Sequence, residues 1–139
     1  MNCLFCSIAQ GHIPAEKVYE DEHAVGFLDI YPRTPGHTII VPRHHSATLE
    51  SLPEAEVAPL FLAVQKMART LVSALGAEGL TIGINQGEVS GQTVPHLHVH
   101  LMPRFKGDGG GSVQSAVHTP QEETLPEIAR RIKNLEPRT

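Results

Sequence analysis

Apolar residues recur at three- and four-residue intervals over positions 57–75, which places them on one face of a helix. Ser51 and Glu54 occupy the two positions of a capping box ahead of this stretch. Gly76 follows the last apolar residue, where a left-handed glycine commonly ends a helix. Pro59 lies inside the pattern, and we expect it to kink the helix or to delay its regular part. The pattern predicts one long helix with a core-facing stripe of Val57, Leu60, Phe61, Val64, Met67, Ala68, Leu71, Val72 and Leu75.

Short runs rich in β-branched and other apolar residues flank this helix. They predict strands at residues 17–20, 24–29, 37–41, 80–85 and 96–102. The region ahead of the helix is punctuated by polar and Pro/Gly turns, so we expect it to consist of strands and turns. The order of strands, long helix and strands indicates an α+β fold with an antiparallel sheet.

The last part of the chain carries a second capping box, from Thr124 to Glu127, which predicts a short C-terminal helix continuing through Leu135. A glycine-rich stretch at residues 107–112 comes before it, and we expect this stretch to be flexible. A length of 139 residues is that of one domain. We therefore expect a single domain over residues 1–139, in which residues 107–139 form a flexible loop and the C-terminal helix.

The composition narrows the class of protein. Hydrophobic residues make up 40% of the chain and charged residues 19%, which is typical of a folded globular protein. A net charge of −4 argues against a general nucleic-acid binder or a binder of anionic membranes. No apolar run reaches the roughly 18 residues of a membrane span, and the N-terminus lacks a basic segment followed by an apolar one. We expect a cytoplasmic protein.

The chain contains nine histidines, nearly as many as its eleven lysines and arginines. Three of the histidines alternate with apolar residues over positions 96–102. Alternation in a strand places His96, His98 and His100 on one face, while the apolar residues between them point into the core. The three rings span about 13 Å, so they cannot surround one ion from a flat strand, but they can line an extended polyanion such as a phosphate chain. The alternative, a histidine-rich surface strand, conflicts with the apolar residues in between.

The run His96-Leu97-His98-Val99-His100-Leu101-Met102 matches the signature of the histidine-triad (HIT) superfamily, His-φ-His-φ-His-φ-φ with φ apolar. Other landmarks resemble the family in the expected order, at residues 13–15, 27–30, 35–37, 41–43 and 91–94. The sequence is most similar to the Hint-like branch with its many bacterial members. The resemblance implies a HIT-like fold with an antiparallel sheet of about five strands, one long helix and a short C-terminal helix, and it implies a homodimer.

The resemblance further implies hydrolysis or transfer at the α-phosphate of purine nucleotides through a nucleotidyl-histidine intermediate. His98 would be the nucleophile, a role that suits an imidazole near its ordinary pKa of about 6.5. His100 would donate a hydrogen bond to a phosphate oxygen, and His37 would orient the nucleophile or shuttle its proton. Thr93 would donate to the bridging atom. The leading substrates are adenosine phosphoramidates and aminoacyl adenylates, from which AMP is released.

The same resemblance assigns a nucleotide pocket. Asp29 would accept hydrogen bonds from both ribose hydroxyls, as a carboxylate does well. The phosphate and the leaving group would be held by Asn85, Gly91, Gln92 and Thr93, and the base would lie against Leu4, Phe5, Ile8, Phe27 and Ile30. The alternatives are that the apolar residues belong to the core, that Asn85 merely ends a strand and that Gly91 serves turn geometry.

Cys3-Leu4-Phe5-Cys6 is a Cys-x₂-Cys pair, which supplies half of a tetrahedral zinc site. In related proteins two histidines complete such a site, and the matching positions here are His96 and His45, with His44 as the adjacent competitor. We expect a structural Zn²⁺ that fastens the N-terminal segment to the sheet. Two unliganded thiols and a redox pair are the alternatives.

Three other functions stay open at this level. One is hydrolysis of diadenosine polyphosphates, which needs the same α-phosphate site. Another is a nucleotide-binding scaffold with incidental hydrolysis. The third is a metal-dependent enzyme that uses His96 and His98 as ligands. The expected partners are a purine nucleotide and a second copy of the chain, with neither nucleic acid nor membrane.

Overall fold

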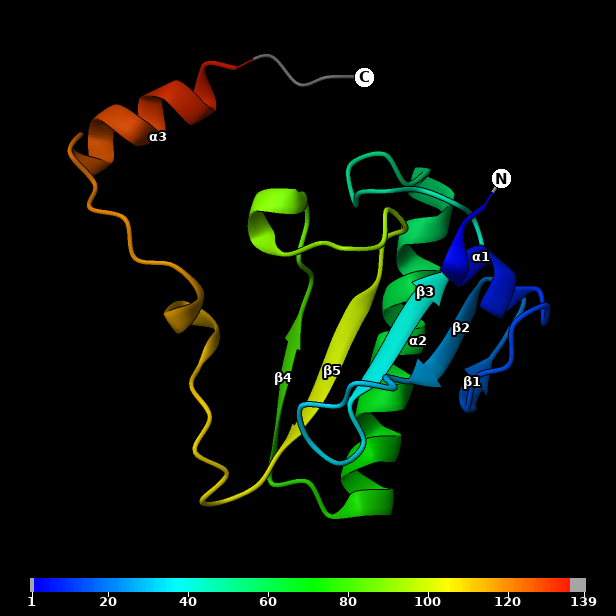
Figure 1. Ribbon diagram of the computed structural model, residues 1–139. Coiled ribbons are helices and arrows are strands. Elements are labelled where there is room, and N and C mark those ends of the chain that lie inside the picture. The colour runs from blue at the N-terminus through cyan, green and yellow to red at the C-terminus, as the bar shows by residue number, and fades with distance from the viewer. Residues whose placement is uncertain (1, 136–139) are drawn as a thin grey trace.

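The computed structural model describes residues 2–135. Five strands form one antiparallel sheet in the order β1-β2-β3-β5-β4 (Figure 1). The prediction of an α+β fold with a five-stranded antiparallel sheet, one long helix and a short C-terminal helix is confirmed. The strands are β1 (Lys17–Glu20), β2 (Ala24–Leu28), β3 (Thr38–Pro42), β4 (Gly79–Gly83) and β5 (Val99–Arg104).

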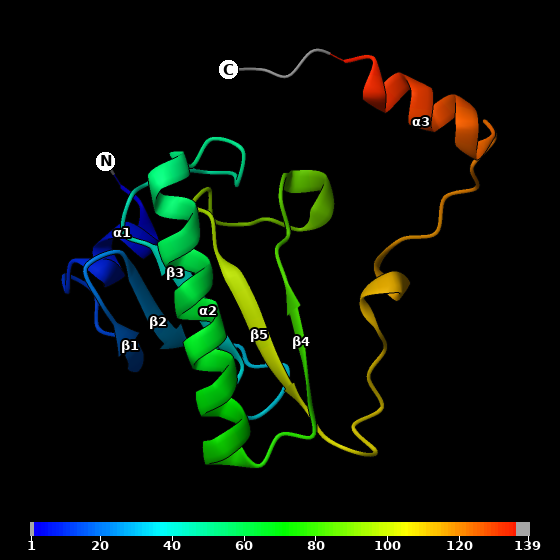
Figure 2. The same cartoon turned by 180° about the vertical axis from the view of Figure 1, so that it is seen from behind.

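The long helix α2 (Glu54–Leu75) lies against one face of the sheet (Figure 2). Leu60, Val64, Met67 and Leu71 of the predicted stripe pack in one core with Ala63, Ile40, Leu97, Val99 and Leu101. The predicted stripe is too wide, because its members Phe61, Val72 and Leu75 are 39%, 46% and 45% exposed. Gly76 ends the helix in the left-handed conformation at φ 68°, as predicted. The helix is continuous across Pro59 and begins five residues before it, so this proline does not delay the helix.

The capping box predicted for α2 is wrong. The residue before the helix is Pro53, which offers no side-chain cap, and Glu54 is already the first helical residue. Ser51 bonds instead within the preceding turn, where its hydroxyl contacts the hydroxyl of Thr48 at 2.9 Å and donates to the Thr48 carbonyl at 3.0 Å. The hydroxyl of Ser51 therefore bonds within the turn and is not available to cap the helix.

The other face of the sheet carries a short helix, α1 (Leu4–Ala9), that sequence analysis did not predict. Its residues Phe5 and Ile8 pack on Val25, Phe27, Ile39 and Val41. Six residues are too few for a helical period to stand out, and its N-cap is the sulfur of Cys3, which accepts a hydrogen bond from the amide of Cys6 at 3.4 Å. Strands β2 and β3 are therefore buried on both faces.

The histidine-bearing strand begins later than predicted. Strand β5 starts at Val99, so His96 and His98 lie in the segment that leads into it rather than on the strand. The Leu97 amide donates to the Ser46 carbonyl at 2.6 Å, which joins this segment to the loop after β3 instead of to the sheet. Side chains in this segment still alternate between the two sides, because the apolar residues between the histidines face α2.

The chain after β5 forms an arm that stands away from the sheet and ends in α3 (Leu125–Lys133) (Figures 1 and 2). The capping box of Thr124 and Glu127 is confirmed. The apolar residues of this helix are largely exposed, with Leu125 at 74% and Ile132 at 70%. Over residues 2–135, no helix has the length and apolar character needed to cross a membrane.

Candidate active site and metal centre

A cavity of about 400 Å³ opens on the α1 face of the sheet. Its apolar wall includes Leu4, Phe5, Ile8, Phe27 and Ile30, the residues expected to hold the base. Its polar groups are the expected Asp29, Asn85, Thr93, His98 and His100, with Gly91 at the edge. This combination of apolar walls with a few convergent polar groups is typical of a small-molecule site.

The position of one proton on His98 follows from its backbone contact. Nδ1 of His98 lies 2.7 Å from the carbonyl oxygen of His96. A carbonyl only accepts, so Nδ1 carries the proton and the neutral ring keeps its lone pair on Nε2. The ring meets Phe5 edge-on, with 4.9 Å between centroids, which fixes its orientation at the cavity wall. The unprotonated nitrogen of a neutral His98 ring is therefore Nε2, the atom not bonded to the backbone.

The proton on His100 is set by a chain of two rings. The backbone amide of Arg33 donates to Nδ1 of His37 at 3.2 Å, so the neutral His37 ring carries its proton on Nε2. Nε2 of His37 lies 2.9 Å from Nδ1 of His100 and donates to it. His100 is left with a proton on Nε2, a hydrogen-bond donor for an anion.

Burial keeps both of these rings neutral. Desolvation lowers the pKa of His37 below its ordinary value and lowers that of His100 to about 4. The structure places His37 against His100, while the contact that orients His98 comes from the backbone of His96. The side chain of His37 therefore contacts His100 rather than His98, contrary to the expectation that it orients His98.

Asp29 directly follows β2 and lines the cavity. Its Oδ1 accepts the amide of Tyr31 at 2.9 Å, and its Oδ2 lies 3.6 Å from Nε2 of His37. The local turn holds the carboxylate at the mouth of the apolar slot. Both oxygens keep acceptor capacity for further donors, since each carboxylate oxygen accepts two hydrogen bonds.

The side chain of Gln92 does not line the cavity, although we expected it to hold the phosphate. Its Oε1 accepts the Gly87 amide at 2.9 Å, and its Nε2 donates to the carbonyls of Ala47 and Val94 at 2.8 and 3.1 Å. The oxygen and the nitrogen of the side-chain amide are thus both engaged in stabilising the loop. Thr93 and Gly91 of the same loop do reach the cavity.

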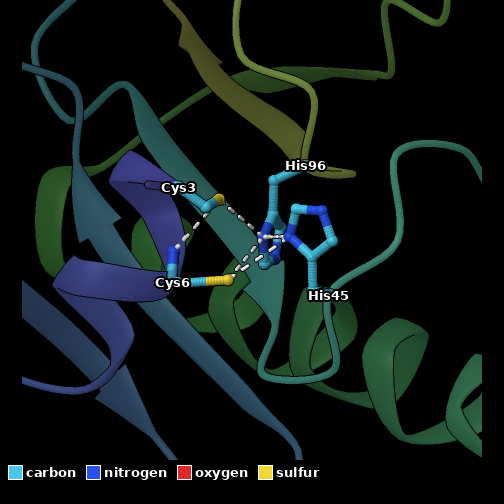
Figure 3. A group of neighbouring side chains, drawn as sticks. All are labelled: Cys3, Cys6, His45 and His96. Carbon is cyan, nitrogen blue, oxygen red and sulfur yellow. Dashed lines mark hydrogen bonds between the residues drawn. The ribbon is translucent and has the colours of Figure 1, made fainter. Parts of the chain in front are cut away.

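Four side chains from separate parts of the sequence meet beside α1 (Figure 3). Sγ of Cys3 lies 3.4 Å from Nδ1 of His96, and Sγ of Cys6 lies 3.5 Å from the same nitrogen. Nδ1 of His45 is 3.3 Å from Sγ of Cys6 and 3.2 Å from Nδ1 of His96. The exposed His44 is not part of this group.

The donor set fits a zinc ion. A tetrahedron with Zn–S of about 2.3 Å and Zn–N of about 2.05 Å has S···N edges of about 3.6 Å and an N···N edge of about 3.3 Å. The distances between these atoms lie close to those edges. Nε2 of His96 donates to the Pro42 carbonyl at 2.8 Å, so the Nδ1 lone pair faces the two sulfurs. Burial raises the pKa of the Cys6 thiol, which a bound cation would offset.

The arrangement corrects the expectation that all three histidines line one polyanion. His96 is completely buried in the sulfur cluster and does not reach the cavity. The adjacent rings of His98 and His100, 5.0 Å apart between centroids, are the pair that faces it. Two of the three rings, those of His98 and His100, therefore share the cavity wall, and His96 does not.

Sequence reasoning missed several residues of the cavity. Ile39 was assigned only to a strand, but its register opposite Phe27 places it on the same face, so the pairing of β2 with β3 was the available signal. Ile13 and Tyr31 reach the cavity from loops, and Tyr31 is 80% exposed. Ile13 belongs to the landmark at residues 13–15, which was the available signal, whereas the contribution of Tyr31 depends on the path of its loop.

The fold places two neighbouring histidines, His98 and His100, at the wall of one cavity. The chain belongs to the HIT domain family, whose model matches residues 10–107. This confirms the resemblance drawn from the histidine run.

An uncharacterised HIT-like protein of Methanocaldococcus jannaschii is 46% identical over 107 residues, which cover 77% of this chain and 82% of that protein. An adenylylsulfatase of Arabidopsis thaliana is 36% identical over 77% of this chain and 54% of its own length.

Two solved structures extend the comparison. The crystal structure of a HIT family member from Bacillus subtilis matches with a TM-score of 0.86 and 40% identity, over 99% of this chain and 100% of that one. A zinc-bound histidine triad family protein from Mycobacterium smegmatis matches with a TM-score of 0.74 and 43% identity, over 78% of this chain and 79% of that one. The HIT fold and the bacterial branch of the superfamily are thereby confirmed.

Proposed function

We propose that this protein hydrolyses or transfers the nucleoside monophosphate group of purine nucleotides through a nucleotidyl intermediate on His98. HIT family members are in general nucleotide hydrolases, and one relative is named for hydrolysis of an adenylyl compound. The observation that carries the proposal is the pair of ring nitrogens at the cavity wall. Nε2 of His98 presents a lone pair, and Nε2 of the neighbouring His100 presents a proton.

The two nitrogens support a two-step displacement. In the first step the lone pair of His98 Nε2 forms a bond to the α-phosphorus, and the bond to the leaving group breaks with its electron pair on that group. The positive charge on the ring is stabilised by the Nδ1–H bond to the His96 carbonyl. In the second step water bonds to phosphorus, the P–N bond breaks and returns its pair to Nε2, and a proton passes to solvent. His100 Nε2–H donates to a phosphate oxygen in both steps.

The rest of the cavity supports an adenosine monophosphate moiety. The apolar wall offers a slot for a purine, and Asp29 at its mouth offers a carboxylate to the two ribose hydroxyls. Thr93 and Asn85 stand beside the two histidines for the phosphate and its bridging atom. The substrates we propose are adenosine phosphoramidates or aminoacyl adenylates, with diadenosine polyphosphates and a nucleotide-binding scaffold as the other candidates.

We propose that the two cysteines with His45 and His96 hold a structural Zn²⁺. The ion would supply a crosslink between the N-terminal segment, the loop after β3 and the segment before β5. Its ligand His96 also provides the carbonyl that orients His98, so the same segment serves the metal and the nucleophile. Thiols kept for a metal suit a reducing compartment, in line with a cytoplasmic location.

We also propose that the protein works as a homodimer. Strand β4 is at the edge of the sheet, and its Ile82 is 40% exposed. Helix α2 exposes Leu62 at 53%, and the arm holds the apolar face of α3 away from its own sheet. A second copy offers these surfaces a partner.

The decisive experiment is trapping of the intermediate. Rapid quench with an adenosine phosphoramidate, followed by intact-mass analysis and peptide mapping, should show one adenylyl group on His98. His98→Ala should abolish both the adduct and the release of AMP, while His44→Ala, which changes an exposed histidine, should preserve them. Turnover by the His98→Ala protein, or an adduct on another residue, would overturn the proposal.

A further inference from the structure

The nucleotide cavity continues into a second hollow of about 380 Å³. The two spaces share His100 and Asn85, whereas His98 lines the first and not the second. An in-line displacement expels the leaving group on the side of phosphorus opposite the nucleophile. If AMP occupies the first cavity, as in the function proposed above, the adjoining hollow, which His98 does not line, is the space available to the leaving group.

One wall of this hollow comes from the arm, at Ser112–Ala116. Arg104 fixes the start of that segment. Its Nε and Nη2 donate to Asp108 at 2.8 and 3.0 Å, and its Nη1 donates to Thr81 Oγ1 at 3.0 Å and to the Gly111 carbonyl at 2.6 Å. The guanidinium holds the pKa of Asp108 well below its ordinary value. The glycine-rich stretch is thus tied to strands β4 and β5 at the point where the hollow begins.

The hollow is mostly apolar and carries one unpaired cation. Ile84, Met102, Val113 and Ala116 supply apolar atoms, and Arg33 lies at its margin. Among the ion pairs of residues 2–135, none includes Arg33. Its charge is close enough to contribute to the lowered pKa of His37, after the larger effect of desolvation. Arg104, on the neighbouring strand β5, is instead paired with Asp108.

We propose that Arg33 and the segment Ser112–Ala116 form a leaving-group subsite that prefers mixed anhydrides of AMP whose leaving group is an anion with an organic part. When an anhydride reacts, the P–O bond breaks and the electron pair stays on the departing oxygen, so no proton is needed and Arg33 meets the new negative charge. When a phosphoramidate reacts, the P–N bond breaks, its electron pair stays on the departing nitrogen, and that nitrogen takes up a proton from solvent, which regains a proton in the hydrolysis step. A cation beside a protonated amine is repulsive. The apolar wall binds the organic part.

Four substrates separate the effect of the leaving group's charge from the effect of its size. Adenosine 5′-phosphoramidate and the tryptamine phosphoramidate of AMP release a small and a large amine. Adenylyl sulfate and diadenosine tetraphosphate release a small and a large anion. The measurement is kcat/KM for each with the full chain and with Arg33→Gln and Val113→Ser. Arg69→Gln, which changes an exposed arginine on α2, is the charge-matched control.

For each size of leaving group, we compare kcat/KM for the substrate that releases an anion with kcat/KM for the one that releases an amine. Arg33→Gln should lower this anion-to-amine ratio by about fivefold, which corresponds to the loss of one exposed ion pair. Val113→Ser should lower the large-to-small ratio by about threefold within both charge classes. Arg69→Gln should move neither ratio. Unchanged ratios with turnover and the His98 adduct intact would overturn the subsite and leave the proposed function standing. Absence of turnover and of an adduct with all four substrates would overturn both.

Discussion

Nδ1 of His98 donates its proton to the backbone carbonyl of His96 at 2.7 Å, and this bond gives the two histidines separate roles. The ring of His96 is turned away into the sulfur cluster, where it is completely buried. The ring of His98 faces the cavity with Nε2 unprotonated. A residue that fits a zinc ion through its side chain thus sets the tautomer of His98, the proposed nucleophile, through its backbone.

The His37–His100 contact makes a first prediction. His37→Leu removes the group that donates to Nδ1 of His100. The proton of His100 can then move from Nε2 to Nδ1, and Nε2 no longer donates toward the proposed phosphate position. We expect kcat to fall by about 10- to 100-fold, as for loss of a positioned hydrogen bond, with little change in the Kd of AMP. His37→Gln, whose amide nitrogen reaches the same position, should recover most of kcat. Equal losses in the two variants would contradict a tautomer-setting role.

The sulfur cluster makes a second prediction. The purified chain should contain one zinc per molecule by elemental analysis, and Cys3→Ser or chelation should remove it. The free energy of unfolding should then fall by roughly 3 kcal/mol, because four buried or half-buried polar groups lose their shared partner. His12→Ala, at an exposed histidine just after α1, is the matched control. A metal-free chain with an unchanged urea midpoint would contradict the zinc site.

The histidine run shows which parts of the site were predictable from sequence. Alternation of polar and apolar residues predicted correctly which side chains face α2 and which face away, because that pattern depends only on the local backbone. The start of β5 was predicted three residues early. It is set by the hydrogen bond between Leu97 and Ser46, which lie 51 positions apart, and no local pattern encodes such a contact.

The missed elements share this cause. Helix α1 is short and capped by a sulfur, so it has neither a clear period nor a usual capping residue. The side chain of Gln92 was assigned to the phosphate, yet its amide bonds to two backbone groups of its own loop and to the carbonyl of Ala47, which lies after β3. Arg33 and the arm reach the site only through tertiary structure. Motif matching identified the histidines that line the cavity, while the second hollow and its lining could be recognised only from the fold.

The pH dependence of stability makes a third prediction. The pKa of His100 is about 4 in the folded chain and about 6.5 in an unfolded one. Between these values the unfolded state binds more protons, so stability is constant above pH 6.5 and falls as the pH is lowered through this window. We expect a loss of roughly 2 kcal/mol from His100 by pH 5, increased by His37, whose pKa is also lowered. Urea titrations at pH 7.5 and pH 5 measure this loss. His100→Gln should show a smaller loss, and an equal one would refute the assignment.

The carboxylate of Asp29 makes a fourth prediction. Asp29→Asn keeps the shape but halves the acceptor capacity, so the Kd of AMP should rise by about tenfold, as for loss of a charged hydrogen bond. The Kd of 2′,3′-dideoxy-AMP should change by less than about twofold, since that ligand has no hydroxyls to lose. Glu22→Gln, at a carboxylate that is 86% exposed, should leave both values unchanged. Calorimetric titration with the two ligands measures both Kd values. If Asp29→Asn weakened the binding of both ligands equally, Asp29 would not bind the ribose hydroxyls.

The arm makes the last prediction. If a second copy covers the apolar face of α3, the chain should sediment as a dimer at micromolar concentration. Ile132→Asp places a charge on that face, where the side chain is 70% exposed in the single chain, and should shift the equilibrium toward monomer. Lys133→Gln, on the same turn but outside the apolar stripe, should have little effect. Because Ile132 is exposed in the isolated chain, its substitution should leave the thermal midpoint of a dilute monomer unchanged. An Ile132→Asp protein with unaltered sedimentation would show that the partner surface lies on β4 or α2 instead.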